Sequence, residues 1–130
     1  MATYTPAETE ARSGFSIGTL RYYERVGLLY DIARDTSGRR VFTDRDLEWL
    51  EILRCLRDTG MPIAQMQRYA DLTVNDGSVD ERLEILRQHD DAVTEQMAQL
   101  RRWRRHLRDK IAYYEGVQEQ APPGPDAPSE

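Results

Sequence analysis

A short segment near the N-terminus, residues 16–29, is rich in side chains suited to binding a nucleic acid. Their hydroxyl, guanidinium and phenol groups belong to Ser16, Thr19, Arg21, Tyr22, Tyr23 and Arg25. Ser16 is also a good helix N-cap, and Gly27 can end a helix in a left-handed turn. A short helix that carries Arg and Tyr fits the major groove of DNA, where side chains reach base edges. The alternative for this segment alone is a solvated helix whose tyrosines pack locally.

Nothing in the chain is typical of an enzyme or a metalloprotein. We find no nucleophile beside a base and no phosphate-binding glycine loop, so we expect no catalytic residue. The single cysteine, Cys55, excludes an internal disulfide. The two histidines, His89 and His106, lie seventeen positions apart, which is not a zinc-type spacing. We therefore expect neither a metal nor a cofactor.

Length and charge limit the architecture and the class of partner. The chain has 130 residues, of which 39% are hydrophobic and 32% charged, which suits one modest domain or a small domain with an appendage. The formal net charge of −5 argues weakly against nucleic acid, but a basic face is a local property. Most of the acidic excess lies in residues 73–130, beyond the proposed DNA-binding helix. Since no signal peptide or membrane-length apolar run is present, we expect a cytoplasmic protein without a membrane partner.

A second short helix is predicted before the first segment. Residues 5–8, Thr-Pro-Ala-Glu, form a capping box with Pro at the first helical position, and this helix should end near Ser13. Gly14 and Phe15 then make a tight turn into Ser16. Helix, short glycine-containing turn and helix together are the helix-turn-helix pattern.

The next residues predict a β-hairpin. Strand-like runs at residues 28–32 and 39–42 flank the turn at residues 35–38, Asp-Thr-Ser-Gly. Arg39 and Arg40 stand at its tip, where they can reach phosphate or the minor groove. A hairpin of this kind beside a helix-turn-helix is a wing. The alternative is a plain solvent-exposed hairpin.

Two further helices should complete the N-terminal domain. Thr43 is a plausible N-cap for an amphipathic helix that ends near Thr59, with Gly60 as its stop. Pro62 opens the next helix, which residues 75–77, Asn-Asp-Gly, terminate. That helix places an apolar set on one side: Ile63, Met66, Tyr69 and Ala70.

The last predicted helix is long and carries a heptad pattern. From residue 78 it meets no Gly or Pro until Gly116, a rod of roughly 50–60 Å. The proposed dimer seam consists of Leu86, Val93, Met97, Leu100, Leu107, Ile111 and Tyr114. Asp90 and Arg104 interrupt one register and could pair across an antiparallel seam. The pattern favours a homodimer over a helix folded back on its own domain.

These elements define a mainly α fold: a winged helix-turn-helix DNA-binding domain followed by a long antiparallel coiled-coil dimerisation helix. We assign residues 1–76 to the first and 77–116 to the second. Residues 117–130 contain four Pro and no aromatic residue, and we expect a disordered tail there.

The chain resembles the MerR (mercury-resistance regulator) family. The resemblance spans residues 4 to about 116 and rests on the run at residues 19–29, the Gly38-x-Arg40-x-Phe42 wing, Asp46-Leu47 and the Thr59-Gly60-Met61 turn. It implies a dimer that grips a palindromic operator in double-stranded promoter DNA. It also implies that the protein distorts promoters with widely spaced −35 and −10 elements so that RNA polymerase engages both.

The resemblance assigns roles residue by residue. Recognition-helix contacts map to Thr19, Arg21, Tyr22 and Tyr23, wing contacts to Arg39 and Arg40, and a phosphate contact to Arg57. Three positions depart from the family pattern. Gly18 replaces a longer residue, Phe42 replaces a common Tyr, and Pro62 replaces a Ser-type cap.

Cys55 is the candidate sensor thiol. The run at residues 54–61 resembles the single-cysteine NmlR/AdhR-like branch, which implies a response to aldehydes or other thiol-reactive stress. Cations at Arg54 and Arg57 would favour the reactive thiolate. The alternatives are a buried, inert thiol in an effector-independent regulator, or a helical protein-interaction module whose rod recruits another protein.

Overall fold

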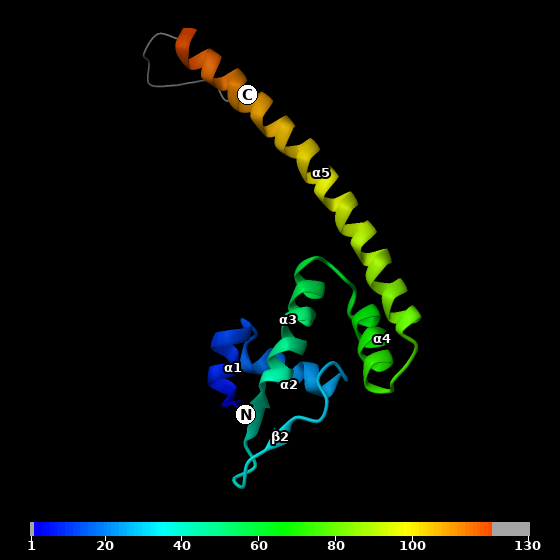
Figure 1. Cartoon of the computed structure of the whole chain (residues 1–130). Coiled ribbons are helices and arrows are strands. Elements are labelled where there is room, and N and C mark those ends of the chain that lie inside the picture. The colour runs from blue at the N-terminus through cyan, green and yellow to red at the C-terminus, as the bar shows by residue number, and fades with distance from the viewer. Residues whose placement is uncertain (1, 121–130) are drawn as a thin grey trace. The chain divides into compact units, whose positions relative to one another are not determined.

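The computed structural model describes residues 2–120 of the chain. It contains five helices and three short strands within that range (Figure 1). In chain order they are β1 (Thr3–Tyr4), α1 (Pro6–Ser13), α2 (Ile17–Arg25), β2 (Ala33–Arg34), β3 (Arg40–Thr43), α3 (Asp44–Asp58), α4 (Ile63–Val74) and α5 (Val79–Gln120). The chain divides into two compact units, residues 1–89 and 90–130. The predicted mainly α architecture is confirmed.

Helices α1 and α2 form where their caps predict them. The Thr5 hydroxyl accepts the Glu8 N–H at 3.1 Å, and the Glu8 carboxylate accepts the Thr5 N–H at 2.9 Å. Gly14 ends α1 with φ of 79°, a left-handed conformation that favours glycine. Phe15 is completely buried directly after it. The tight turn is therefore held by a buried side chain, which fixes the orientation of α2 relative to α1.

The predicted wing is a three-stranded sheet rather than a two-stranded hairpin. The strand order is β1-β3-β2, with Tyr4 opposite Phe42 and Arg34 opposite Arg40. The two-residue strand β1 escapes prediction because it is too short to show alternation. The predicted first strand at residues 28–32 is wrong: Leu28 and Leu29 are buried in the core, and β2 begins only at Ala33. In Figure 1 the turn between β2 and β3 extends away from the helices.

Helices α3 and α4 enclose the core of the first unit. Thr43 and Asp46 form a reciprocal capping box at the start of α3, as its sequence predicts. The buried side chains of these two helices are Leu50, Leu53, Leu56, Met66 and Ala70. Ile63 does not share the buried face of α4, since 40% of it is exposed.

Helix α5 is a single uninterrupted helix of 42 residues, roughly 63 Å long (Figure 1). It continues past Gly116 to Gln120, so residues 117–120 are helical rather than tail. The predicted disorder of residues 121–130 lies outside the described residues. The first unit also includes the beginning of α5, because Ile85 is buried and Leu86 packs against the core. The first compact unit therefore extends beyond residue 76 to residue 89.

Candidate nucleic-acid interface

The start of α2 is held by its own hydroxyl groups. The Ser16 Oγ accepts the Thr19 N–H at 3.0 Å and donates its proton to the Thr19 Oγ1 at 3.0 Å. Thr19 Oγ1 keeps its own proton, because it is the acceptor in this bond. The cap therefore leaves the hydroxyl proton of the half-buried Thr19 available for another acceptor at the beginning of the helix.

The exposed face of α2 carries cations and one aromatic ring. Tyr22 is 40% exposed, and the Arg25 guanidinium lies over its ring, 5.3 Å from the centroid. Arg21 is exposed, and no ion pair or hydrogen bond between described residues involves its side chain. Two guanidinium groups and a phenol thus face solvent along one helix, as the sequence predicts.

Tyr23 lies in the core, although its ring centroid is only 6.0 Å from that of the exposed Tyr22. Only 4% of it is exposed, and its ring packs edge-on against Phe15 at a centroid distance of 5.2 Å. Burial raises the pKa of the Tyr23 phenol, while the nearby Arg57 guanidinium opposes the increase. The expectation that Tyr23 offers a flat ring to the surface is corrected: its ring is structural, and its hydroxyl end lies near Arg57.

The turn of the wing is rigidly closed. The Asp35 Oδ1 accepts the N–H groups of Ser37 and Arg39, both at 2.9 Å. Arg34 donates to the Gly38 carbonyl at 2.9 Å across the same turn. These bonds fix the backbone around Arg39, whose side chain is exposed. Arg39 therefore lies between the turn and β3 with an exposed side chain.

Arg40 does not stand at the tip beside Arg39. It lies in β3, and its Nε donates to the Glu24 Oε1 at 2.6 Å, with about a quarter of each side chain exposed (24% and 26%). This ion pair joins the last turn of α2 to the wing. Sequence reasoning missed Glu24, because nothing in one sequence pairs residues sixteen positions apart.

The end of α3 supplies further cations beside α2. Arg57 lies over the Phe15 ring at 4.6 Å and donates to the Asp58 carboxylate at 2.9 Å. Arg54 donates to the same carboxylate at 3.3 Å and to the Ser13 carbonyl at 3.1 Å. Hydrogen bonds from Arg57 and Arg54 lower the pKa of Asp58. The α2 face, the wing and Arg57 therefore belong to one packed unit.

Cys55 is exposed on α3, so the alternative of a buried thiol is wrong. Its surroundings contain a contact that the sequence did not indicate. The Thr59 hydroxyl donates to the Cys55 carbonyl at 2.6 Å and lies 2.6 Å from the His89 Nε2 in α5. The backbone at Cys55 is therefore linked through Thr59 to α5.

Beyond Leu86 and the half-buried Val93, the predicted seam residues are substantially exposed. Exposed fractions range from 36% at Tyr114 to 67% at Leu100. Within residues 2–120 we find no group of three or more His, Cys, Asp or Glu side chains placed to hold a metal ion. The same residues include no helix that is both long and apolar enough to span a bilayer.

Comparison with known families decides the class of protein. Residues 4–73 match the model of the MerR HTH family regulatory proteins, and residues 47–110 match the model described as MerR, DNA binding. The chain belongs to the MerR family. It is a MerR-family DNA-binding transcriptional regulator, with a winged helix-turn-helix domain and a long C-terminal helix.

Individual relatives agree with this assignment. An HTH-type transcriptional regulator of Haemophilus influenzae is 40% identical over 114 residues, which cover 87% of this chain and 84% of the relative. AdhR of Bacillus subtilis is 38% identical over 81 residues, 62% of this chain and 58% of AdhR. The crystal structure of HiNmlR, a MerR regulator lacking the sensor domain and bound to promoter DNA, matches with a TM-score of 0.84. Its identity is 38%, over 92% of this chain and 95% of HiNmlR. These relatives are transcriptional regulators rather than enzymes.

Proposed function

We propose that this MerR-family chain acts as a homodimer that distorts promoter DNA and thereby controls RNA polymerase. The observation that carries the proposal is the exposed Arg and Tyr face of α2, joined to the wing through Glu24 and Arg40. A recognition helix that is joined to a wing can contact base edges in the major groove while the wing contacts the DNA phosphate backbone. The similarity to HiNmlR, which was crystallised on promoter DNA, supports the same mode of binding.

The proposed contacts are the eight predicted residues Ser16, Thr19, Arg21, Tyr22, Tyr23, Arg39, Arg40 and Arg57. Arg21, Tyr22 and Arg39 contribute whole exposed side chains. Tyr23 contributes only its hydroxyl end, since its ring is buried. Arg40 donates through its terminal nitrogens, because its Nε is engaged by Glu24.

A gel-shift or fluorescence-anisotropy titration on the protein's own promoter tests the DNA contacts. Affinity should fall steeply with salt concentration, and Arg21→Ala and Tyr22→Ala should each weaken specific binding by roughly 1–3 kcal/mol. Arg87→Ala is the matched control, because Arg87 is an exposed arginine of α5 outside the proposed interface. Binding that ignores salt and tolerates both substitutions would refute the proposal.

Two copies would present two α2 helices to the two halves of a palindromic operator. The dimer seam is the heptad face of α5, where Met97, Leu100, Leu107 and Ile111 are each at least 49% exposed. Apolar side chains at heptad spacing gain most of their stability from burial against a second helix. Sedimentation equilibrium of the intact chain should therefore report a dimer.

We further propose that Cys55 senses aldehydes or other electrophiles. Its exposure makes the thiol accessible, and the Cys55–Thr59–His89 chain gives its modification a route to α5. Cys55→Ser should bind the promoter normally and lose the transcriptional response to formaldehyde. Slow alkylation of Cys55 together with an unchanged wild-type transcript under aldehyde stress would leave an effector-independent regulator as the better description.

A further inference from the structure

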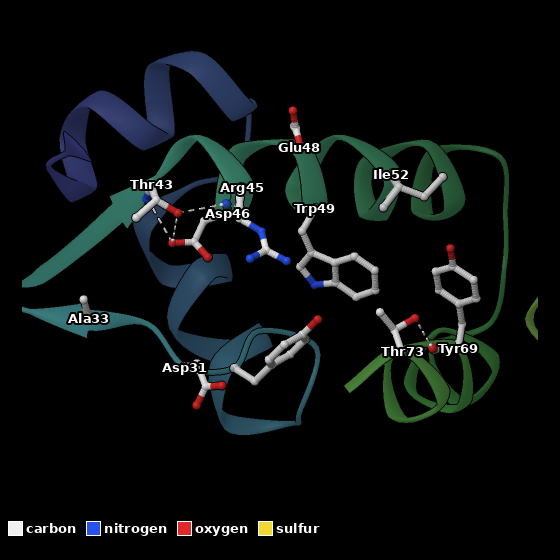
Figure 2. Close-up of a pocket in the computed structure, with 11 residues that line it drawn as sticks. Asp31, Ala33, Thr43, Arg45, Asp46, Glu48, Trp49, Ile52, Tyr69 and Thr73 are labelled. Carbon is white, nitrogen blue, oxygen red and sulfur yellow. Dashed lines mark hydrogen bonds between the residues drawn. The ribbon is translucent and has the colours of Figure 1, made fainter. Parts of the chain in front are cut away.

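A cavity of about 620 Å³ lies between the wing and helices α3 and α4 (Figure 2). Its lining comes from the β2 region, the end of β3, the first half of α3 and α4. None of the eight proposed DNA-binding residues lines it. The volume lies within the range of small-molecule sites in proteins, roughly 300–1,000 Å³.

One part of the lining is a preformed aromatic wall. The Trp49 indole N–H donates to the Leu28 carbonyl at 2.7 Å, which fixes the ring. The Tyr69 ring is parallel to the indole within 9°, at a centroid distance of 5.7 Å. The Tyr30 ring meets the indole edge-on at 5.9 Å and 66°. A flat apolar group can therefore pack on this wall without first ordering it.

The rest of the lining carries charges of both signs. Figure 2 shows the Arg45 guanidinium extending between Asp46 and Trp49, and no ion pair or hydrogen bond between described residues involves it. Asp46 uses its Oδ2 to accept the Thr43 N–H and hydroxyl, at 2.9 and 3.1 Å, which leaves its Oδ1 available. The Asp31 carboxylate also makes no hydrogen bond with a described residue.

Asp31, Arg45 and Asp46 line the cavity together with Tyr30. Burial raises the pKa of the Tyr30 phenol, Arg45 lowers it, and Asp31 and Asp46 raise it further. One cation and two carboxylates therefore act on the same phenol. Glu48 also lines the cavity, but in Figure 2 its carboxylate points away from Arg45 and Trp49.

We propose that this cavity binds an aromatic amino acid or a compound of the same chemistry. The aromatic ring packs on Trp49 and Tyr69, the carboxylate takes the planar fork of Arg45, and the ammonium faces Asp31 and Asp46. Arg binds carboxylates through two parallel hydrogen bonds, which suits this arrangement. A ligand that has only a carboxylate or only an ammonium leaves one kind of charged group in the site without a partner. That group loses hydration on binding without gaining an ion pair, which lowers the affinity.

Fluorescence titration of the full-length protein tests the binding. The chain has two tryptophans, so Trp103→Phe leaves Trp49 as the sole indole reporter. The probes are L-phenylalanine, 3-phenylpropionate, which lacks the ammonium, and phenethylamine, which lacks the carboxylate. L-phenylalanine should change Trp49 emission saturably. Each analogue should bind roughly tenfold more weakly, as expected for one lost charge-assisted hydrogen bond.

Two variants test which residues of the cavity bind the carboxylate and the ammonium of the ligand. Arg45→Gln should reduce L-phenylalanine affinity to that of phenethylamine, and Asp31→Asn should reduce it to that of 3-phenylpropionate. Asn suits position 31 because it tolerates the φ of 55° found there. Arg87→Gln is the control and should leave affinity unchanged, because Arg87 does not line the cavity. Thermal unfolding confirms that every variant is folded.

Three results would overturn the proposal: no saturable binding of L-phenylalanine, an analogue with one charge that binds equally well, or an affinity unaffected by Arg45→Gln. None of these readouts involves DNA. The outcome is therefore separate from that of the proposed regulatory function.

Discussion

Consecutive tyrosines on α2 have opposite environments. Successive side chains on a helix are about 100° apart, so a helix nine residues long can bury one and expose the next. Tyr23 fills the space beside Phe15, whereas Tyr22 meets solvent and the Arg25 guanidinium. Tyr23 therefore stabilises the packing of α2, whereas Tyr22 is accessible to solvent.

Substituting each tyrosine with alanine should separate stability from DNA binding. Tyr23→Ala removes a buried ring and should lower the free energy of unfolding by roughly 3–5 kcal/mol, as measured by urea denaturation. Tyr22→Ala should lower it by less than about 0.5 kcal/mol, because the ring is a surface side chain, yet weaken promoter binding. Equal losses of stability in the two variants would contradict the assignment of Tyr23 to the core.

The Glu24–Arg40 ion pair should contribute measurably to stability. Glu24→Gln leaves a three-quarters-buried guanidinium without its anion and should cost roughly 1–2 kcal/mol, between the values for surface and buried pairs. Glu81→Gln is the matched control. The Arg68–Glu81 pair is longer, at 3.4 Å, and more than half exposed, so it should cost less than about 0.5 kcal/mol. Urea denaturation of the variants checks both values.

At the scale of elements, two positions near the start of α2 differ in whether their backbone conformation requires glycine. Gly14 has a φ of 79°, and a Cβ there would meet the Arg54 guanidinium that donates to Ser13. Gly18 lies inside the helix, and the nearest side-chain atom, the Ser16 Oγ, would be 3.9 Å from an added Cβ. The first glycine is therefore required by conformation, and the second is not.

Alanine at these two positions should shift stability in opposite directions. Gly14→Ala should lower the free energy of unfolding by roughly 1–2 kcal/mol, because a left-handed conformation is unfavourable for alanine. Gly18→Ala should raise it by roughly 0.5–1 kcal/mol, the difference in helix propensity. Thermal and urea denaturation report both changes. A stabilised Gly14→Ala variant would mean that the turn between α1 and α2 relaxes easily.

Most helix boundaries were predictable from local chemistry. Thr5, Ser16 and Thr43 cap helices as their sequence contexts predict, and Gly14 and Gly27 adopt positive φ. These signals act over three or four residues, which is why one sequence reveals them. Strand β1 was missed because its only evidence is pairing with β3, about forty residues away.

The candidate site was only partly predictable, because tertiary contacts select among similar residues. The exposure of Arg21 and the existence of the wing followed from pattern and resemblance. The burial of Tyr23 and the engagement of Arg40 by Glu24 depend on packing between elements. The aromatic cavity could not be anticipated, since Tyr30, Trp49 and Tyr69 come from a loop and two helices.

At the scale of the whole molecule, the part of α5 beyond residue 89 belongs to a unit of its own and carries many exposed apolar side chains. Residues 90–130 form a unit separate from the first. Its exposed apolar side chains include Met97, Leu100, Trp103, Leu107, Ile111 and Tyr113. An isolated helix gains most of its stability from burying such a face. A second copy of the same helix offers a matching heptad pattern, which is why we place the dimer there.

Leu100→Asp should dissociate the proposed dimer. Leu100 is 67% exposed in the single chain and central in the predicted seam, so a dimer would place a carboxylate from each copy in an apolar interface. The matched control is Tyr113→Asp, which introduces the same charge at a residue 56% exposed but outside the seam. Sedimentation equilibrium should show a monomer for the first variant and a dimer for the second.

Because a monomer presents one α2 helix, Leu100→Asp should also lose the tight binding to a palindromic operator while retaining weak, salt-sensitive binding. A dimeric Leu100→Asp protein, or dissociation by Tyr113→Asp alone, would place the interface on another face of α5.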